Sequence, residues 1–117
     1  RSPIQARQSR MPRSWPVRVR SSKGTAVREL RWTKRARADL DEIVDYIAAR
    51  NPTAAERIEQ LIEDAADQLP HRPFIYRRGR IPDTREAVVH PNYIIVYRVS
   101  DKEILIGAVL HARQRYP

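Results

Sequence analysis

The sequence predicts an α+β domain in which a hairpin of two helices packs on a small, mainly antiparallel sheet. Segments typical of strands, with alternating or dense β-branched residues, lie at both ends of residues 27–111. Between them the apolar spacing switches twice to the helical period of about 3.6 residues, with only two or three residues between the two helical stretches. The expected order is therefore strand, helix, helix and three strands, with the helices on one face of the sheet.

The first strand is expected at Val27–Trp32, where apolar and polar residues alternate, and it is predicted to lie at a sheet edge. Thr33 follows as a favourable N-cap for a helix that begins at Lys34. Asn51-Pro52 ends this helix, because the residue before a proline disfavours the helical conformation. The apolar stripe of this helix comprises Ala36, Leu40, Ile43, Val44 and Ile47, and its expected polar face comprises Asp39, Asp41, Glu42 and Asp45.

The second helix is expected to begin at Pro52 or Thr53 and to end before Pro70. A basic loop with two prolines and one glycine, residues 71–83, follows it. The predicted apolar stripe of the helix comprises Ala55, Ile58, Leu61, Ile62, Ala65 and Leu69, and its acidic side chains, which comprise Glu56, Glu59, Glu63, Asp64 and Asp67, are expected to face water.

The stretch from Thr84 to Gln114 predicts three consecutive antiparallel strands. The middle strand is dense in β-branched and aromatic residues on both of its faces, so we expect it to be central and covered on at least one side. The three strands are expected at Arg85–Val89, Tyr93–Val99 and Ile104–His111, with connections at His90-Pro91-Asn92 and Ser100-Asp101-Lys102.

The positive charge is concentrated at the start of the chain. The 117 residues carry a net charge of +9. Residues 1–26 contain seven Arg or Lys residues and no acid, whereas residues 28–117 contain sixteen basic and fourteen acidic residues. We expect residues 1–26 to be a disordered basic extension and residues 27–117 to be the folded domain. A basic tail of this kind can also bind nucleic acid through phosphate contacts.

Several classes of protein are excluded or disfavoured by composition. The chain has no cysteine, which excludes disulfides and thiolate metal sites and is consistent with a cytoplasmic protein. It has no apolar run of the roughly 20 residues that a membrane helix requires. His71, His90 and His111 lack metal-ligand spacing, and no phosphate-binding or dinucleotide-binding glycine motif is present. We therefore expect neither a metal nor a cofactor.

Two basic sets remain as candidate functional residues. One runs from Tyr76 through Arg77, Arg78 and Arg80 to Arg85, and the other is the C-terminal run from His111 to Tyr116. We expect the two sets to converge on one basic edge, which would suit an RNA backbone or an acidic protein surface. The alternative is a set of surface arginines that only keeps the domain soluble.

Four segments, occurring in order, resemble the ParE/RelE superfamily of bacterial toxins: LRWTKRARADLDEIVDYIA, NPTAAERI, GRIPDTREAVVHPNYIIVYRV and VLHARQRYP. The resemblance covers about residues 27–117. It implies the RelE/ParE fold and the toxin of a type II toxin–antitoxin pair, with roles in plasmid stabilization and growth regulation. It also implies an antitoxin that wraps a helix or tail around the toxin in a hetero-oligomer. We expect the antitoxin to be acidic and to contact the helix hairpin, at Leu40, Ile47, Ile58 and Ile62, and the adjoining sheet edge.

The superfamily has two activities. RelE-like members cleave mRNA on the ribosome, and that hypothesis would make Arg85, His111, Arg113 and Tyr116 catalytic. ParE-like members inhibit DNA gyrase and cleave no RNA. This chain has Ala87 and Ile94 where the nucleases carry cations, and the loss of such a cation costs several kcal/mol of transition-state stabilisation.

These departures favour gyrase inhibition by a protein that is not an enzyme. Its docking surface would comprise Arg77, Arg78, Arg80, Arg85 and Arg113. A ribosome-dependent mRNA endonuclease is the first alternative, and a basic nucleic-acid-binding module is the second.

Overall fold

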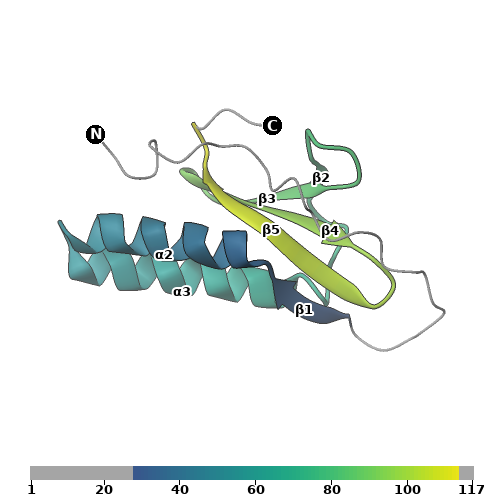
Figure 1. Cartoon of the computed structure of the whole chain (residues 1–117), viewed down its shortest axis with the longest axis horizontal. Helices are drawn as coiled ribbons and strands as arrows, with labels where there is room; N and C mark the ends of the chain where they lie inside the picture. Colours follow the sequence, from purple (N-terminus) through teal and green to yellow (C-terminus); the bar gives the residue numbers. More distant parts are fainter. Residues whose placement is uncertain (1–27, 114–117) are drawn as a thin grey trace.

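A layer of two helices and a five-stranded sheet make up residues 28–113, the part of the chain that the computed structural model describes (Figure 1). The two helices lie side by side against one face of the sheet, so the predicted α+β architecture is confirmed. The predictions for residues 1–26 and for Tyr116 fall outside the described residues. In chain order the elements are β1 (Glu29–Trp32), α2 (Lys34–Ala48), α3 (Pro52–Gln68), β2 (Arg77–Arg78), β3 (Arg85–His90), β4 (Tyr93–Val99) and β5 (Glu103–His111).

The strand order in the sheet is β1-β5-β4-β3-β2. The first strand lies at an edge, as predicted, and it pairs in parallel with β5, with Leu30 opposite Ile104. The strands β3, β4 and β5 form the predicted antiparallel meander, with β4 between the other two. Between β1 and β5 the chain forms the helix hairpin and the strands β2, β3 and β4, which lead from the far edge of the sheet back toward β1. A parallel pair requires a long connection of this kind.

Both helices begin at residues whose side chains accept a backbone N–H. The Thr33 hydroxyl accepts from Ala36 N at 3.0 Å, which confirms the predicted cap of α2. The Asn51 side chain accepts from Ala54 N at 3.0 Å and caps α3. Thr33 also ties the helix to the sheet, because its hydroxyl donates to the carbonyl of Gly107 at 3.2 Å.

The prediction that residues 71–83 form only a loop is wrong at Arg77–Arg78, which pairs antiparallel with the start of β3. A two-residue strand made of two arginines has no apolar alternation for a sequence pattern to detect. The chain then turns at residues 81–84, where Thr84 N donates to the Ile81 carbonyl at 3.1 Å and Asp83 has a φ of 66°. Proline at the second position and positive φ at the third are typical of a type II turn. Gly79 lies so close to this turn that a Cβ there would collide with the Thr84 hydroxyl.

The main core lies between the helices and the sheet. A bulge in β5, between the partners of Val96 and Tyr97, leaves Gly107 without an opposite residue. As a result Ile106 and Val109 both face the helices, although an unbroken strand would place them on opposite faces. The buried residues of this helix-side core are Ala36, Leu40, Ile43, Ile62, Ala66, Leu69, Ala87, Tyr93, Ile95, Tyr97, Ile104, Ile106 and Val109.

The predicted polar face of the first helix is wrong at Asp39, which is buried. Its carboxylate accepts from Val109 N at 3.0 Å and from Arg35 Nε at 3.1 Å. The strand β1 ends at Trp32, opposite Ile106, so it cannot pair with the last part of β5. Asp39 accepts the N–H group of Val109 in place of a strand neighbour, which a count of polar residues along one helix could not reveal.

The apolar stripe of the second helix is rotated relative to the prediction. Ala66, which was not assigned to the stripe, is fully buried, whereas Leu61, which was assigned to it, is 38% exposed. The buried face of the helix is therefore turned toward Ala66 and away from Leu61. Within residues 28–113, neither helix has the length and apolarity required to cross a bilayer.

Candidate functional site

The sheet face away from the helices carries a second, smaller apolar cluster. It consists of Ile94, Val96, Ala108 and Leu110, with Ile81 and Ala112 packed against it. Ile94, which occupies a position where the nucleases carry a cation, lies in this cluster. Ala87 is different, because it is fully buried in the helix-side core. The lack of charge at Ala87 therefore follows from its packing against the helices, whereas Ile94, which is 4% exposed, packs on the opposite face of the sheet.

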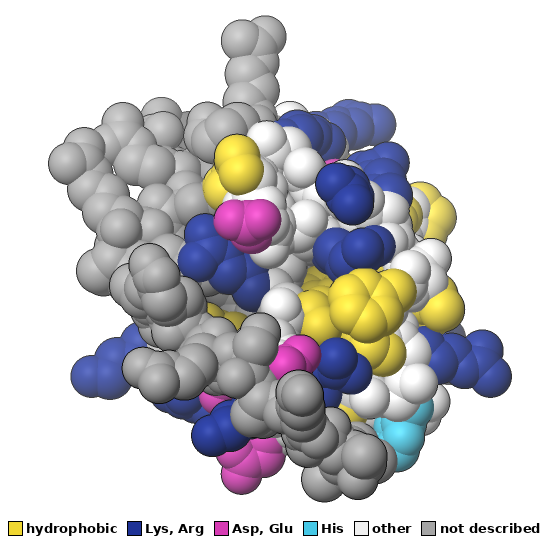
Figure 2. Space-filling model, turned by 90° about the vertical axis from the view of Figure 1, so that its right-hand side faces the viewer, with side chains coloured by type: hydrophobic (Ala, Val, Ile, Leu, Met, Phe, Trp, Pro, Cys, Tyr) yellow, Lys and Arg dark blue, Asp and Glu magenta, His cyan; other side chains and the backbone are white. Residues whose placement is uncertain are grey.

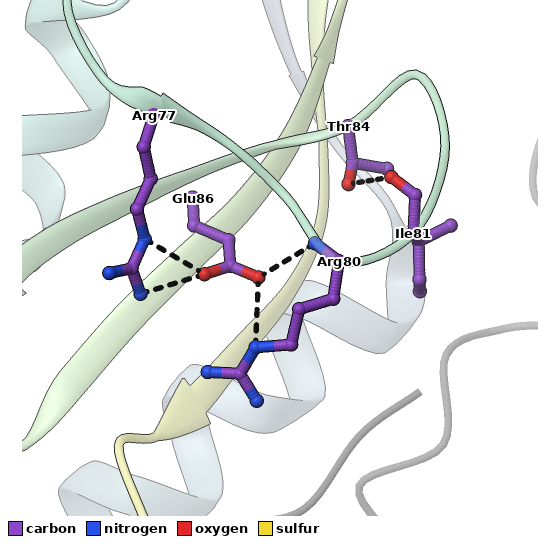
Figure 3. A network of polar contacts seen from close by, with 5 residues as sticks. All are labelled: Arg77, Arg80, Ile81, Thr84 and Glu86. Carbon is purple, nitrogen blue, oxygen red and sulfur yellow. Dashed lines mark hydrogen bonds and ion pairs between the residues drawn. The ribbon is translucent and has the colours of Figure 1, made fainter.

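A buried carboxylate organises the arginines beside β2 (Figure 3). Glu86 is 2% exposed and accepts from Arg77 Nε at 3.1 Å and Arg77 Nη2 at 2.8 Å. Its other oxygen accepts from the backbone N–H of Arg80 at 3.1 Å and lies 3.5 Å from Arg80 Nε. Figure 3 shows the Glu86 carboxylate between the two arginine side chains. Two of the five predicted docking arginines therefore have a neutralising partner, and their guanidinium groups are held in position.

Arg85 precedes Glu86 in β3 and lies on the opposite face of the sheet, toward the helices. It pairs opposite Tyr97, its Nη1 donates to the Tyr76 carbonyl at 2.8 Å, and its guanidinium carbon lies 4.9 Å from the centroid of the Phe74 ring. Arg78, opposite Arg85 in the β2–β3 pair, is exposed. The four arginines of residues 77–85 are thus distributed over both faces at the β2 end of the sheet.

The expectation that both basic sets line one edge is wrong. Arg85 lies opposite Tyr97, whereas His111 lies opposite Tyr93. These two positions are four residue steps apart along β4, or about 13 Å. In an antiparallel meander the third strand runs parallel to the first, so β5 ends beside the end of β3 and not beside its beginning. The hydrogen bond from Ala112 N to the Asn92 carbonyl, at 2.7 Å, holds the residue before Arg113 at this far end.

His111 belongs to a small aromatic group at the far end of the strands, in which Tyr93 lies between His90 and His111. Its ring meets Tyr93 edge-on at a centroid distance of 5.5 Å, and the His90 ring lies 5.5 Å from Tyr93 on a tilted plane. His111 Nδ1 accepts from Arg113 N at 3.1 Å. Burial, and secondly the charge of Arg113, lower the pKa of His111, and burial followed by Tyr46 raises the pKa of Tyr93. Both effects on His111 favour the neutral form of its imidazole.

Two of the four residues predicted to contact an antitoxin are inaccessible. Leu40 is 1% exposed and Ile62 is fully buried, because both pack against the sheet. The prediction is wrong for these two. Ile47 and Ile58 are half-buried at the border of the core. The accessible part of the hairpin's apolar stripe therefore includes Ile47 and Ile58.

Sequence reasoning missed the exposed apolar residues of the loop before β2. Phe74 is 57% exposed and Ile75 is 59% exposed. In the sequence Phe74 and Tyr76 lie among arginines, which is a pattern typical of a binding surface. Only the arginines were predicted to form the docking surface. Among residues 28–113, no group of three or more His, Asp or Glu side chains is arranged to hold a metal ion.

Comparison with known families identifies the family to which the chain belongs. Residues 30–116 match the family model described as the ParE toxin of a type II toxin–antitoxin system, parDE. The chain belongs to the ParE toxin family. It is similar to Y4kP of Sinorhizobium fredii, with 47% identity over 91 residues that cover 77% of this chain and 94% of that protein.

This ParE-family chain is also similar to a toxin named RelE2 and to a solved structure of a ParDE system. Toxin RelE2 of Caulobacter vibrioides is 43% identical over 83 residues, covering 69% of this chain and 91% of the toxin. A chain of the chromosomal ParDE system of P. aeruginosa has a similar structure, with a TM-score of 0.67 and 27% identity over 73% of this chain and 96% of that one. This protein is therefore a toxin of a type II toxin–antitoxin system.

Proposed function

We propose that this toxin acts by inhibiting DNA gyrase, through arginine side chains that dock on the target and perform no chemistry. The observation that supports this most directly is the distance between the groups a nuclease would need. Arg85 and His111 lie opposite residues of β4 that are about 13 Å apart. A general acid and a cation that stabilises the phosphorane must both contact the same reacting phosphate.

The surroundings of these groups also favour docking over catalysis. The apolar cluster around Ile94 offers no charge to a phosphate. The carboxylate of Glu86 already engages Arg77 and Arg80, and a carboxylate repels an approaching phosphate. The proposed docking residues are therefore Arg78 and Arg85, with Arg77 and Arg80 positioned by Glu86, and Arg113 contributing at the far end.

The direct test measures two activities of the purified toxin side by side. We expect the protein to inhibit DNA supercoiling by gyrase and to leave mRNA intact on a programmed ribosome. His111→Ala should retain most of the inhibition, whereas the loss of a general acid would reduce a rate by about 10²–10⁴. Cleavage of mRNA between codons, with supercoiling unaffected, would instead support the nuclease alternative.

We also propose that a cognate antitoxin binds and neutralises this chain, since the similar P. aeruginosa structure is that of a toxin–antitoxin system. Ile47 and Ile58, the half-buried apolar residues of the hairpin, are the proposed contacts. Co-expression with the product of the adjacent small gene should give a complex that co-purifies and should restore growth. Failure of both would contradict this proposal.

A further inference from the structure

The loop that joins α3 to β2 presents two adjacent apolar side chains to solvent. Phe74 and Ile75 are 57% and 59% exposed, more than any other large apolar residue of the described chain. Figure 2 looks at this end of the molecule and shows an apolar patch bordered by Lys and Arg side chains. An exposed apolar patch with a polar rim commonly marks an interaction site.

This loop is held in place from both sides, so its exposure is not a consequence of loose packing. Tyr97, which is fully buried, donates its hydroxyl to the Pro73 carbonyl at 2.8 Å. Arg85 donates to the Tyr76 carbonyl at 2.8 Å. The two bonds flank Phe74 and Ile75 on either side in sequence. The fold therefore uses a buried hydroxyl and a half-buried guanidinium to fix a loop whose apolar side chains are exposed. Such preorganisation lowers the cost of binding at a docking surface.

Positive charge surrounds the Phe74 ring. The guanidinium carbons of Arg28 and Arg85 lie 5.5 Å and 4.9 Å from its centroid. Their hydrogen bonds go to the carbonyls of Ser100 and Tyr76, and within residues 28–113 neither is paired with a carboxylate. This distinguishes them from Arg77 and Arg80, which share Glu86. Arg72, at the start of the loop, is also exposed.

We infer that Phe74 and Ile75, rimmed by Arg28, Arg72 and Arg85, form the surface on which the target protein docks an acidic segment that carries an apolar side chain. The apolar pair would receive the apolar side chain, and the arginines would pair with the carboxylates. Only Phe74 of the apolar pair is aromatic, whereas nucleic-acid surfaces stack successive bases on aromatic rings, which favours a protein partner. The inference rests on the proposed function in that it takes the target to be a protein.

The position of this surface separates it from the proposed antitoxin contacts. The helix hairpin turns between α2 and α3 at one end of the molecule, and the loop that carries Phe74 follows the opposite end of α3 (Figure 1). Ile47 lies in the last turn of α2 and Ile58 lies in the first half of α3, both nearer to the hairpin turn. We therefore assign the Phe74 surface to the target and not to the antitoxin.

The test begins with binding alone. Short random peptides displayed on phage are selected on the full-length toxin, and we expect the enriched peptides to be acidic and to contain a large apolar residue. The double variant Phe74→Ser/Ile75→Ser should weaken their binding at least about tenfold, as for the central residues of an interface. Arg28→Gln should also weaken it. The matched controls, Val88→Ser and Arg57→Gln, replace an apolar residue that is 46% exposed and an exposed arginine elsewhere, and should bind as the wild type does.

The second measurement asks whether the same surface meets the target. The selected peptides should relieve the inhibition of supercoiling, and the double variant should inhibit at least about tenfold less well than the wild type, while both controls inhibit normally. Full inhibition by the double variant would overturn the inference and leave the proposed function intact. If the wild type does not inhibit supercoiling, the proposed function fails, and with it the assignment to that target.

Three other results would overturn the inference. The first is the enrichment of neutral or basic peptides, or of none. The second is binding to single-stranded or duplex DNA that depends on Phe74 and Ile75, which would indicate a nucleic-acid surface. The third is self-association that disappears in the double variant, measured by sedimentation, which would indicate a second copy of the chain. Thermal unfolding of each variant serves as the control for folding, and each is expected to unfold cooperatively as the wild type does.

Discussion

At the scale of single residues, Glu86 is the group on which the arrangement of the basic β2 end depends. Its carboxylate is 2% exposed and holds Arg77 and Arg80. Glu86→Ala should lower the free energy of unfolding by about 2–3 kcal/mol, because hydrogen bonds to charged groups and a buried ion pair are lost together. Glu63, which is 39% exposed and lies 3.9 Å from Arg37, is the control, and Glu63→Ala should cost less than about 1 kcal/mol. Equal losses in denaturant unfolding would contradict this view of Glu86.

A second residue-scale prediction concerns the pH dependence of stability. Burial and Arg113 lower the pKa of His111 below 6.5, so the unfolded chain binds this proton more readily than the folded chain does. The free energy of unfolding of the wild type should therefore fall, relative to His111→Gln, as the pH decreases below 6.5. His71→Gln, a substitution of an exposed histidine, is measured in parallel as the matched variant. Urea unfolding at several pH values measures the difference, and parallel curves for wild type and His111→Gln would show that the histidine does not contribute.

At the scale of elements, the hydroxyl of Thr33 makes two hydrogen bonds at the junction between β1 and α2. Thr33 caps the helix at Ala36 N and also donates to the Gly107 carbonyl at the bulge of β5. Asn51 caps α3 at Ala54 N in an exposed position. Asn51→Ala should cost about 1 kcal/mol, the usual value of an N-cap, and Thr33→Ala should cost about 1 kcal/mol more. The two variants are compared by thermal and denaturant unfolding, and an equal cost would mean that the bond to Gly107 contributes nothing.

At the scale of the whole molecule, the separation of Arg85 from Arg113 distinguishes docking from catalysis. Arg85 lies at the beginning of β3, and Arg113 follows the end of β5 at the other end of the strands. Residues more than about 7–10 Å apart that share no partner usually have additive effects within about 0.5 kcal/mol. The free-energy losses of Arg85→Ala and Arg113→Ala in gyrase inhibition should therefore add in the double variant. Substitutions of residues that act together in one catalytic unit have strongly non-additive effects. A double variant whose loss differs clearly from the sum of the single losses would therefore support the nuclease alternative.

Much of this fold could be predicted because its signals are local. The cap at Thr33, the helix end before Pro52 and the dense β-branched run of β4 each depend on neighbours in sequence. The order of elements and the family resemblance followed from these segments. The two-residue strand β2 could not be predicted, because its partner Glu86 comes from another strand and its own residues carry no apolar pattern.

What the sequence determined by itself is therefore the class of fold, the approximate ends of most elements and the concentration of arginine around residues 72–85. Only the tertiary structure decided which of these charges are neutralised and which face solvent. Burial of Asp39 and Glu86, exposure of Phe74 and the distance between Arg85 and His111 all depend on pairs of segments far apart in the chain. The physical reason is that strand pairing and the β5 bulge set which side chains meet, and neither is encoded in the period of any one segment.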